Sequence, residues 1–296
     1  MPARSVALLS AGAYAHLDED LSLLVPALEE HGVPTVVADW HDRTVDWAAH
    51  DLVVIRSPWD YTDRVDEFLA VLATIDAATV LANPLEVVRA NVDKRYLARL
   101  AALGVPVVAT TVLEPGDDPA LPDGVPVVVK PTVSAGARDT DRYEPGEVDA
   151  ARAHAQRLLD AGRSVLVQPY VESVDVRGET GLVFLGDELS HAFRKGPILR
   201  PGAKFVEGLY REEEIEARAP SAVEREVAEA VLDAVADLLP GRTRRDLLYA
   251  RVDLVEGDTG PVLMELELTE PSLFLTTDPP AAARAAVAIA QVLERT

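Results

Sequence analysis

The sequence predicts a parallel α/β region followed by an α+β region, and three observations support this fold class. Over residues 1–90, short apolar runs alternate with helical stretches, which is typical of βαβ units and a parallel sheet. After the turn-rich segment 115–125, strands follow one another closely, which favours antiparallel pairing. The composition, 48% hydrophobic and 26% charged over 296 residues, is that of a globular protein long enough for about two domains.

The elements of the first region can be placed from apolar periodicity and turn residues. Helices are expected at 18–30, with Gly32 just beyond the end, and at 65–72. Pro26 interrupts the first helix, which should therefore be kinked or begin later than its pattern indicates. Apolar and β-branched runs predict four strands, at 6–9, 35–37, 52–55 and 80–81.

The second region begins with an expected helix at 91–103, which stops at Gly104. A helix at 148–159 interrupts strands that should form one mostly antiparallel sheet, at 127–129, 164–171, 180–185 and 189–193. Ser221 and Glu224 form a capping box that opens a further helix. The apolar stripe of that helix consists of Val223, Val227, Val231, Val235 and Leu238. Two strands joined by a short turn complete the pattern, at 248–255 and 262–268.

Charge and cysteine content exclude several classes of function. Cysteine is absent, so thiol nucleophiles, disulfides, Fe–S clusters and zinc ribbons are excluded. The formal net charge of -22 argues against a nucleic-acid partner, because phosphate backbones bind basic surfaces. The first apolar run is too short for a signal sequence or a membrane span. We therefore expect a soluble cytoplasmic protein with no nucleic-acid and no membrane partner.

The two last strands carry an acidic face. Alternation places Arg251 and Asp253 on one face of the first strand, and Glu265 and Glu267 together on the second. The opposite face of the second strand should hold Met264, Leu266 and Leu268. Same-face carboxylates lie only ~7 Å apart on a strand, so a counter-cation is expected, and carboxylates without His or Cys suit Mg²⁺. A solvated amphipathic hairpin is the alternative that this pattern leaves open.

Lysine is rare in this chain, because most of its basic residues are arginines. The four lysines are Lys94, Lys130, Lys195 and Lys204. Lys130 ends a strand and precedes the small-residue loop 132–140, whose backbone N–H groups could bind phosphate, although a plain surface loop fits equally. The chain contains neither a P-loop motif nor a G-x-G-x-x-G fingerprint, which makes a Rossmann-type dehydrogenase improbable. The strand exit at 168–172 presents backbone that suits an adenine ring, or is a simple turn.

The order and spacing of these segments resemble the ATP-grasp superfamily of carboxylate ligases over nearly the whole chain. The resemblance implies an N-terminal parallel-sheet domain at 1–90 and two ATP-clasping lobes at 91–172 and 173–296. It also implies that ATP is held by Lys94, Lys130, Ser134, Gly136, Gln168, Pro169, Tyr170, Val171 and Glu179. Glu179 would take the ribose hydroxyls, with Asp175 as a competitor for that role.

The same resemblance assigns the metal and catalytic residues. Asp253, Glu265 and Glu267 match the ligands of Mg²⁺, with Mn²⁺ as an alternative, although Glu267 stands where the superfamily typically has asparagine. The catalytic cations would be Arg251, Lys204, Arg194 and Lys195. In such enzymes a substrate carboxylate attacks the γ-phosphorus of ATP, and a nitrogen nucleophile then displaces phosphate from the acyl phosphate.

Segments 56–61 and 265–274 are most similar to the branch that contains D-cycloserine synthetase, a cyclo-ligase of antibiotic biosynthesis that acts on O-ureido-D-serine. Arg56 suits a substrate carboxylate, and Asp60 suits an ammonium group. Further substrate contacts would come from Trp59, Tyr61 and Ser272, although the two aromatic residues could equally anchor their loop. An intermolecular amino-acid ligase and a non-catalytic nucleotide-binding module remain as alternatives, and a homodimer is left open.

Overall fold

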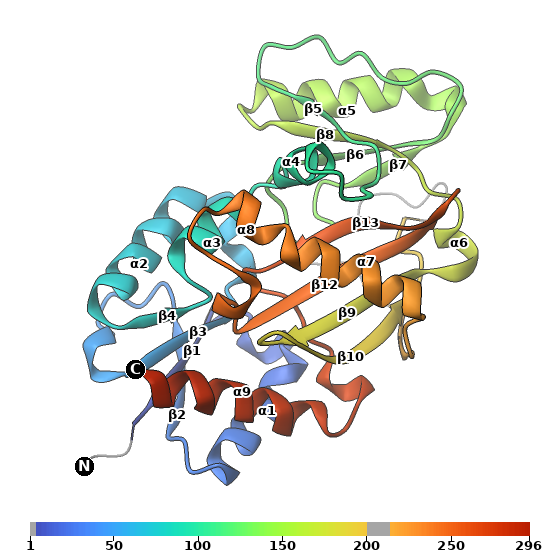
Figure 1. The fold of residues 1–296 in the computed structure, drawn as a ribbon. Helices are drawn as coiled ribbons and strands as arrows, with labels where there is room; N and C mark the ends of the chain where they lie inside the picture. The colour runs from blue at the N-terminus through green and yellow to red at the C-terminus, as the bar shows by residue number, and fades with distance from the viewer. Residues whose placement is uncertain (1–3, 200–213) are drawn as a thin grey trace.

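Three sheets form the frame of the molecule in the computed structural model, which describes residues 4–199 and 214–296 (Figure 1). The first is a parallel sheet of order β2-β1-β3-β4. Its strands are β1 (Val6–Ser10), β2 (Thr35–Asp39), β3 (Leu52–Ser57) and β4 (Val80–Ala82). Its helices are α1 (Glu19–Glu30), α2 (Val65–Ala78) and α3 (Leu85–Asn91). The predicted parallel α/β region is therefore confirmed.

The closely spaced strands divide between two antiparallel sheets, so the expectation of a single sheet is wrong. One sheet has the order β5-β8-β6-β7, and the other has the order β11-β10-β9-β12-β13. The strands are β5 (Thr111–Leu113), β6 (Val127–Pro131), β7 (Asp141–Tyr143), β8 (Val165–Pro169), β9 (Glu179–Leu185), β10 (Glu188–Lys195), β11 (Ile215–Ala217), β12 (Tyr249–Gly257) and β13 (Gly260–Glu267). Each sheet has its own apolar core, and alternation within a strand does not reveal which core that strand joins.

Helices cover both antiparallel sheets. The core of the smaller sheet is completed by α5 (Val148–Asp160). The larger sheet packs against α4 (Tyr96–Ala102), α7 (Ala222–Asp233) and α8 (Val235–Leu238). A short helix, α6 (Val174–Arg177), lies between β8 and β9 in the chain. Figure 1 shows the α5 unit above the β12–β13 hairpin, with the parallel sheet to one side.

Three details of the predicted helices differ from the structure. Helix α1 begins at Glu19, where Asp18 caps it, and continues through Pro26, so it does not begin late. The expected helix at 91–103 is interrupted between α3 and α4, because the backbone N–H of Lys94 donates to Thr132 instead of to a helical carbonyl. The capping box of α7 is confirmed, but Val223 is 54% exposed, so the predicted apolar stripe is wrong at its first position.

The C-terminal helix α9 (Ala281–Arg295) packs beside α1 in Figure 1, although the sequence patterns gave no expectation for it. Its alanines, Ile289 and Leu293 join a core that also contains Val6 and Leu8 of the parallel sheet. The two ends of the chain therefore share one core, and the division at residues 90 and 172 stays a prediction. Within 4–199 and 214–296, no helix is both long and apolar enough to cross a membrane.

Candidate active site

A cavity of about 800 Å³ lies where the three sheets meet, and it collects most of the residues singled out in the sequence. The predicted site residues that line it are Trp59, Tyr61, Lys94, Lys130, Ser134, Gly136, Gln168, Pro169, Tyr170, Val171, Glu179, Lys195, Arg251, Glu265, Glu267 and Ser272. These side chains come from segments up to 213 residues apart in the sequence, Trp59 to Ser272. The structure thus brings the two sequence regions together at one site.

The β12–β13 hairpin has the polar face that alternation predicted. Arg251 pairs with Glu267 and Asp253 with Glu265 across the two strands. A register shift follows, because Leu254 is opposite Leu263, which leaves Met264 as the extra residue of a β-bulge. Met264 packs against the small cluster of Val108, Val174 and Val255, whereas Leu266 belongs to the core of the larger sheet, so the face predicted for Met264 is wrong.

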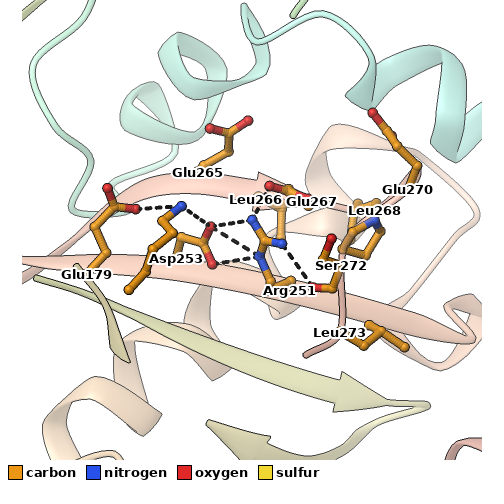
Figure 2. Close-up of polar contacts among 12 residues, drawn as sticks. Glu179, Arg251, Asp253, Glu265, Leu266, Glu267, Leu268, Glu270, Ser272 and Leu273 are labelled. Atoms are coloured by element: carbon orange, nitrogen blue, oxygen red, sulfur yellow. Dashed lines mark hydrogen bonds and ion pairs between the residues drawn. The ribbon is translucent and has the colours of Figure 1, made fainter. Parts of the chain in front are cut away.

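Arg251 is the centre of the hydrogen-bond network on this face (Figure 2). Its Nε lies 3.0 Å from Asp253 Oδ1 and its Nη2 lies 2.8 Å from Asp253 Oδ2, so the guanidinium donates to both carboxylate oxygens. Nη1 donates to the carbonyl of Ser272 at 2.9 Å, and Nη2 also donates to Glu267. Arg251 therefore fixes the two hairpin carboxylates and the loop after β13 in one arrangement.

Two lysines pair with the remaining acids. Lys94 Nζ lies 3.1 Å from Glu265, and it donates to the backbone carbonyl of Ser134 at 2.5 Å. Lys195 Nζ lies 3.0 Å from Glu179 and 3.6 Å from Asp253. These contacts join the turn before α4 and the edge of β10 to the hairpin.

Lys130 differs from its neighbours, because it is buried without a carboxylate within 4 Å in the described part of the chain. Burial lowers its pKa, Glu265 opposes this, and the charges of Lys94 and Lys195 lower the pKa further. A buried lysine in this state favours an anionic ligand that would replace its lost hydration.

The acidic side chains carry more negative charge than their partners neutralise. Burial raises the pKa of Glu267, Arg251 lowers it, and Asp253, Glu265 and Glu270 raise it further, leaving it well above its ordinary value. Burial also acts to raise the pKa of Glu265, but Lys94, Lys130 and Lys195 hold it below the ordinary value. Glu267 is therefore the hairpin carboxylate whose ionised form an added cation would favour.

The donor chemistry fits a hard divalent cation, whereas the present geometry is not a ready-made cage. Across the described residues, no group of three or more His, Asp or Glu side chains is arranged to hold a metal ion. Mg²⁺ commonly takes one or two carboxylates together with phosphate oxygens, so a protein-only cage is not required. Glu265 and Glu267 line the cavity, whereas Asp253 lies behind them at 1% exposure.

The strand exit after β8 is braced at the other end of the cavity. Gln168 Nε2 donates to Thr110 Oγ1 at 2.9 Å, which holds a buried amide side chain. Tyr170 donates to Asp175 at 2.5 Å, and the Arg142 guanidinium lies 3.6 Å from the centre of the Tyr170 ring. Asp175 is therefore held by Tyr170 and Arg142 and is absent from the cavity lining, whereas Glu179 lines the cavity and pairs with Lys195.

The loop 132–140 lies over the cavity with several residues in unusual backbone conformations. Gly136 has φ 59°, and Ala137 and Asp139 have φ 56° and 53°. Asp139 accepts from Arg163 at 2.6 Å, and Arg138 donates to Asp63 of the N-terminal region at 2.6 Å. The predicted phosphate loop is thus tied to two different parts of the chain.

Two predicted substrate residues lie outside the cavity lining and act as structural supports. Arg56 is 1% exposed and donates to Asp20 at 3.3 Å and to the carbonyl of Pro271 at 3.1 Å. Asp60 accepts from Trp40 at 2.8 Å and contacts His41 Nε2 at 2.7 Å. Direct contact of either side chain with substrate is therefore not supported, because neither lines the cavity, although only Nη2 of Arg56 has a hydrogen-bond partner among the described residues.

Among the predicted catalytic cations that the structure describes, Arg194 is not at the site. Arg194 donates to the carbonyl of Arg177 at 2.8 Å and is absent from the cavity lining, since adjacent strand residues face opposite sides. Lys204 lies outside the described residues. Lys195 and Arg251 are the catalytic candidates that line the cavity.

Glu270 is a site residue that the sequence patterns did not single out. It lines the cavity together with Tyr61, and its charge helps to raise the pKa of Tyr61. Burial raises the pKa of Glu270, Tyr61 and Lys94 lower it, and Glu265 raises it again. The resulting pKa is about 7. Its position after the strand, where alternation no longer applies, explains why face arguments missed it.

The three-sheet frame, with a cavity lined by lysines and carboxylates, defines an ATP-grasp ligase. The family model of the N-terminal domain of D-cycloserine synthetase DcsG matches residues 6–83. The cycloserine biosynthesis protein DcsG of Streptomyces lavendulae is 40% identical over 306 residues, covering 98% of this chain and 99% of that protein. The chain therefore belongs to the D-cycloserine synthetase family.

Solved structures agree with this assignment. The crystal structure of D-cycloserine synthetase DcsG matches with a TM-score of 0.88 and 42% identity, covering 98% of this chain and 99% of that one. A D-alanine–D-alanine ligase from Bacillus anthracis in complex with ATP matches with a TM-score of 0.69 and 14% identity, over 99% and 98% of the two chains. The predicted superfamily, fold and ATP-dependent ligase class are confirmed.

Proposed function

We propose that this protein is a cyclo-ligase of antibiotic biosynthesis that converts O-ureido-D-serine to D-cycloserine at the expense of ATP. The substrate carboxylate would be activated as an acyl phosphate, and the tethered nitrogen would then close the ring. Hydrolytic loss of the carbamoyl group from that nitrogen, as carbon dioxide and ammonia, would complete the conversion. The observation that carries this proposal is the single cavity in which lysines, carboxylates and the Trp59–Tyr61 segment meet. The 40% identity to DcsG over nearly the whole chain supports the choice of substrate.

The nucleotide would lie along the lysine-rich side of the cavity. Adenine would contact the strand exit 168–171, and the ribose hydroxyls would donate to Glu179. Lys94 and Lys130 would bind the phosphates, with the loop at Ser134 and Gly136 closing over them. Lys130 is the strongest of these assignments, because its burial without an anionic partner among the described residues favours phosphate at that position.

Asp253, Glu265 and Glu267 would hold Mg²⁺, or Mn²⁺ in its place, together with phosphate oxygens of ATP. The metal supplies charge neutralisation at the transferred phosphoryl group. Glu265 and Glu267 present oxygens to the cavity, and Asp253 keeps Arg251 in place beside them. Arg251 and Lys195 would offset the charge that develops during transfer.

The amino-acid substrate would occupy the end of the cavity lined by Trp59, Tyr61, Glu270 and Ser272. Catalysis in the first step is then mainly positioning, since the carboxylate and the γ-phosphorus need only be held in line. We further propose units at 1–90, 91–172 and 173–296 and a cytoplasmic location, with a homodimer left open.

The test uses the purified full chain with ATP, Mg²⁺ and O-ureido-D-serine, and measures ADP release and D-cycloserine by mass spectrometry. We expect both products from one organic substrate. ADP release that requires a second amine would instead show an intermolecular ligase. ATP binding without ADP release, across a panel of amino-acid derivatives, would show a non-catalytic nucleotide-binding module.

A further inference from the structure

Glu270 lies in the cavity but has no role yet in acyl phosphate formation or ring closure as proposed above. It follows β13 and lines the cavity on the same side as Tyr61 and Ser272. In Figure 2 its carboxylate points away from the Arg251–Asp253 pair. It therefore belongs to the substrate end of the site and not to the guanidinium network.

The backbone around Glu270 is held on both sides. Its carbonyl accepts from Trp59 Nε1 at 3.1 Å, and the following carbonyl, of Pro271, accepts from Arg56 at 3.1 Å. The preceding residue, Thr269, donates to Asn91 at 3.2 Å. Such bracing fixes the direction in which the Glu270 side chain leaves the backbone, as a reacting group requires.

The carboxylate shares the cavity lining with Tyr61. Tyr61 is 2% exposed with its ring stacked on Phe68 at 4.6 Å, and the charge of Glu270 helps to raise its pKa. Among the residues that the structure describes, no lysine or arginine lies within 4 Å of the Glu270 carboxylate, unlike Glu265 and Glu267. Within the described residues, the Glu270 carboxylate is thus not committed to a cation.

The groups that face Glu270 come from four elements. They are Tyr61 of the segment after β3, Lys94 of the turn before α4, Arg251 and Tyr249 of β12, and Glu265 and Glu267 of β13. Their net effect, with burial as the largest contribution, raises the pKa of the carboxyl to about 7. At that value a carboxylate both accepts and releases a proton readily near neutral pH.

We propose that Glu270 is the catalytic residue that accepts the proton of the attacking nitrogen during ring closure. This rests on the cyclo-ligase function proposed above. The nitrogen forms a bond to the acyl carbon, and the bond from that carbon to the phosphate oxygen breaks. The electron pair leaves with inorganic phosphate, and the N–H proton passes to a carboxylate oxygen of Glu270. The carbamoyl group that the ring nitrogen still carries is then removed by water as carbon dioxide and ammonia, which gives D-cycloserine. Water is the only further reactant.

The test separates the two half-reactions in the full-length enzyme with ATP, Mg²⁺ and O-ureido-D-serine. Positional isotope exchange in ATP labelled at the β,γ-bridge reports acyl phosphate formation, and mass spectrometry reports ring closure. In E270Q, which keeps the side-chain shape, we expect exchange to persist while ring closure falls by about 10²- to 10⁴-fold. E270D should restore part of that loss. Glu256→Gln, an exposed glutamate on the same hairpin, is the matched control and should leave both rates unchanged.

The pH profile gives a readout that a structural role would not produce. Ring closure by the wild-type enzyme should fall below about pH 7, as Glu270 becomes protonated, and E270Q should lack that limb. A wild-type rate of ring closure in E270Q, or an equal loss of isotope exchange and ring closure in that variant, overturns the proposal for Glu270 alone. Isotope exchange without any cyclic product in the wild-type enzyme overturns the cyclo-ligase function as well.

Discussion

Two neighbouring glutamates of the same strand should respond in opposite ways to the same substitution. Glu265→Gln removes the partner of buried Lys94, which lies 3.1 Å away. Glu267→Gln removes a charge whose ionised form is disfavoured, since burial and three carboxylates raise the pKa of Glu267 despite Arg251. We therefore expect the metal-free protein to be destabilised by the first change and stabilised by the second.

The magnitudes follow from the contacts. Removing one partner of a buried ion pair costs about 3–5 kcal/mol, and the amide keeps one hydrogen bond, so the lower end, about 3 kcal/mol, applies to E265Q. One unit of raised pKa corresponds to about 1.4 kcal/mol, and a gain on the order of 2 kcal/mol is expected for E267Q near neutral pH. Each kcal/mol moves the Tm of a chain this long by about 2 °C.

The assay is urea and thermal unfolding in EDTA at pH 7.5, repeated with Mg²⁺ and ADP. Bound ligand should stabilise the wild-type protein and neither variant, and both variants should lose turnover. Glu256→Gln serves again as the exposed control, with an expected change below about 0.5 kcal/mol. A less stable E267Q in EDTA, or turnover in either variant, would refute the charge balance described for the hairpin.

Three further predictions concern separate parts of the site. Lys130→Ala should lower kcat/KM for ATP at least ~100-fold without lowering Tm, because the lysine is buried with a depressed pKa; a large fall in Tm would contradict this. Asp20→Ala should cost about 3 kcal/mol and raise KM for the amino-acid substrate, because Asp20 binds Arg56 and accepts from the backbone N–H groups of Leu273 and Leu275; an unchanged KM would argue against loop positioning. The folded pKa of Glu270 is above the unfolded one, so stability should fall as pH rises from about 4.5 to 7, and E270Q should gain about 2–3 kcal/mol above pH 7; parallel pH curves for the two proteins would exclude this.

The candidate functional side chains could be predicted where strand alternation alone determines the face of the sheet on which they lie. Strand alternation correctly gave one polar face to Arg251, Asp253, Glu265 and Glu267, and the strand pairing then brought them together. The rule failed at Met264, because a β-bulge inserts one residue and reverses the faces beyond it. A bulge depends on the partner strand, which a single strand's sequence does not reveal.

Contacts between distant segments could not be predicted in the same way. Arg56 lies near the carboxyl end of β3, which favoured substrate binding, yet it is buried outside the cavity lining and its Nη2 donates to Asp20 and Pro271. Asp60 has similar partners in Trp40 and His41. A buried charge needs partners, and whether these are substrate or protein depends on packing that only the assembled fold determines.

The segment 270–275 is where the N-terminal region shapes the substrate end of the cavity. Trp59 and Arg56 bind two successive carbonyls of this segment, and Asp20 accepts from two of its N–H groups. The proposed nucleotide end is instead built by the antiparallel sheets and the loop over them. A change of substrate can therefore arise within the N-terminal region without disturbing the lysines and carboxylates proposed to bind ATP and Mg²⁺. The match of residues 6–83 to the N-terminal domain of D-cycloserine synthetase covers Asp20, Arg56 and Trp59, which are the side chains that hold this segment.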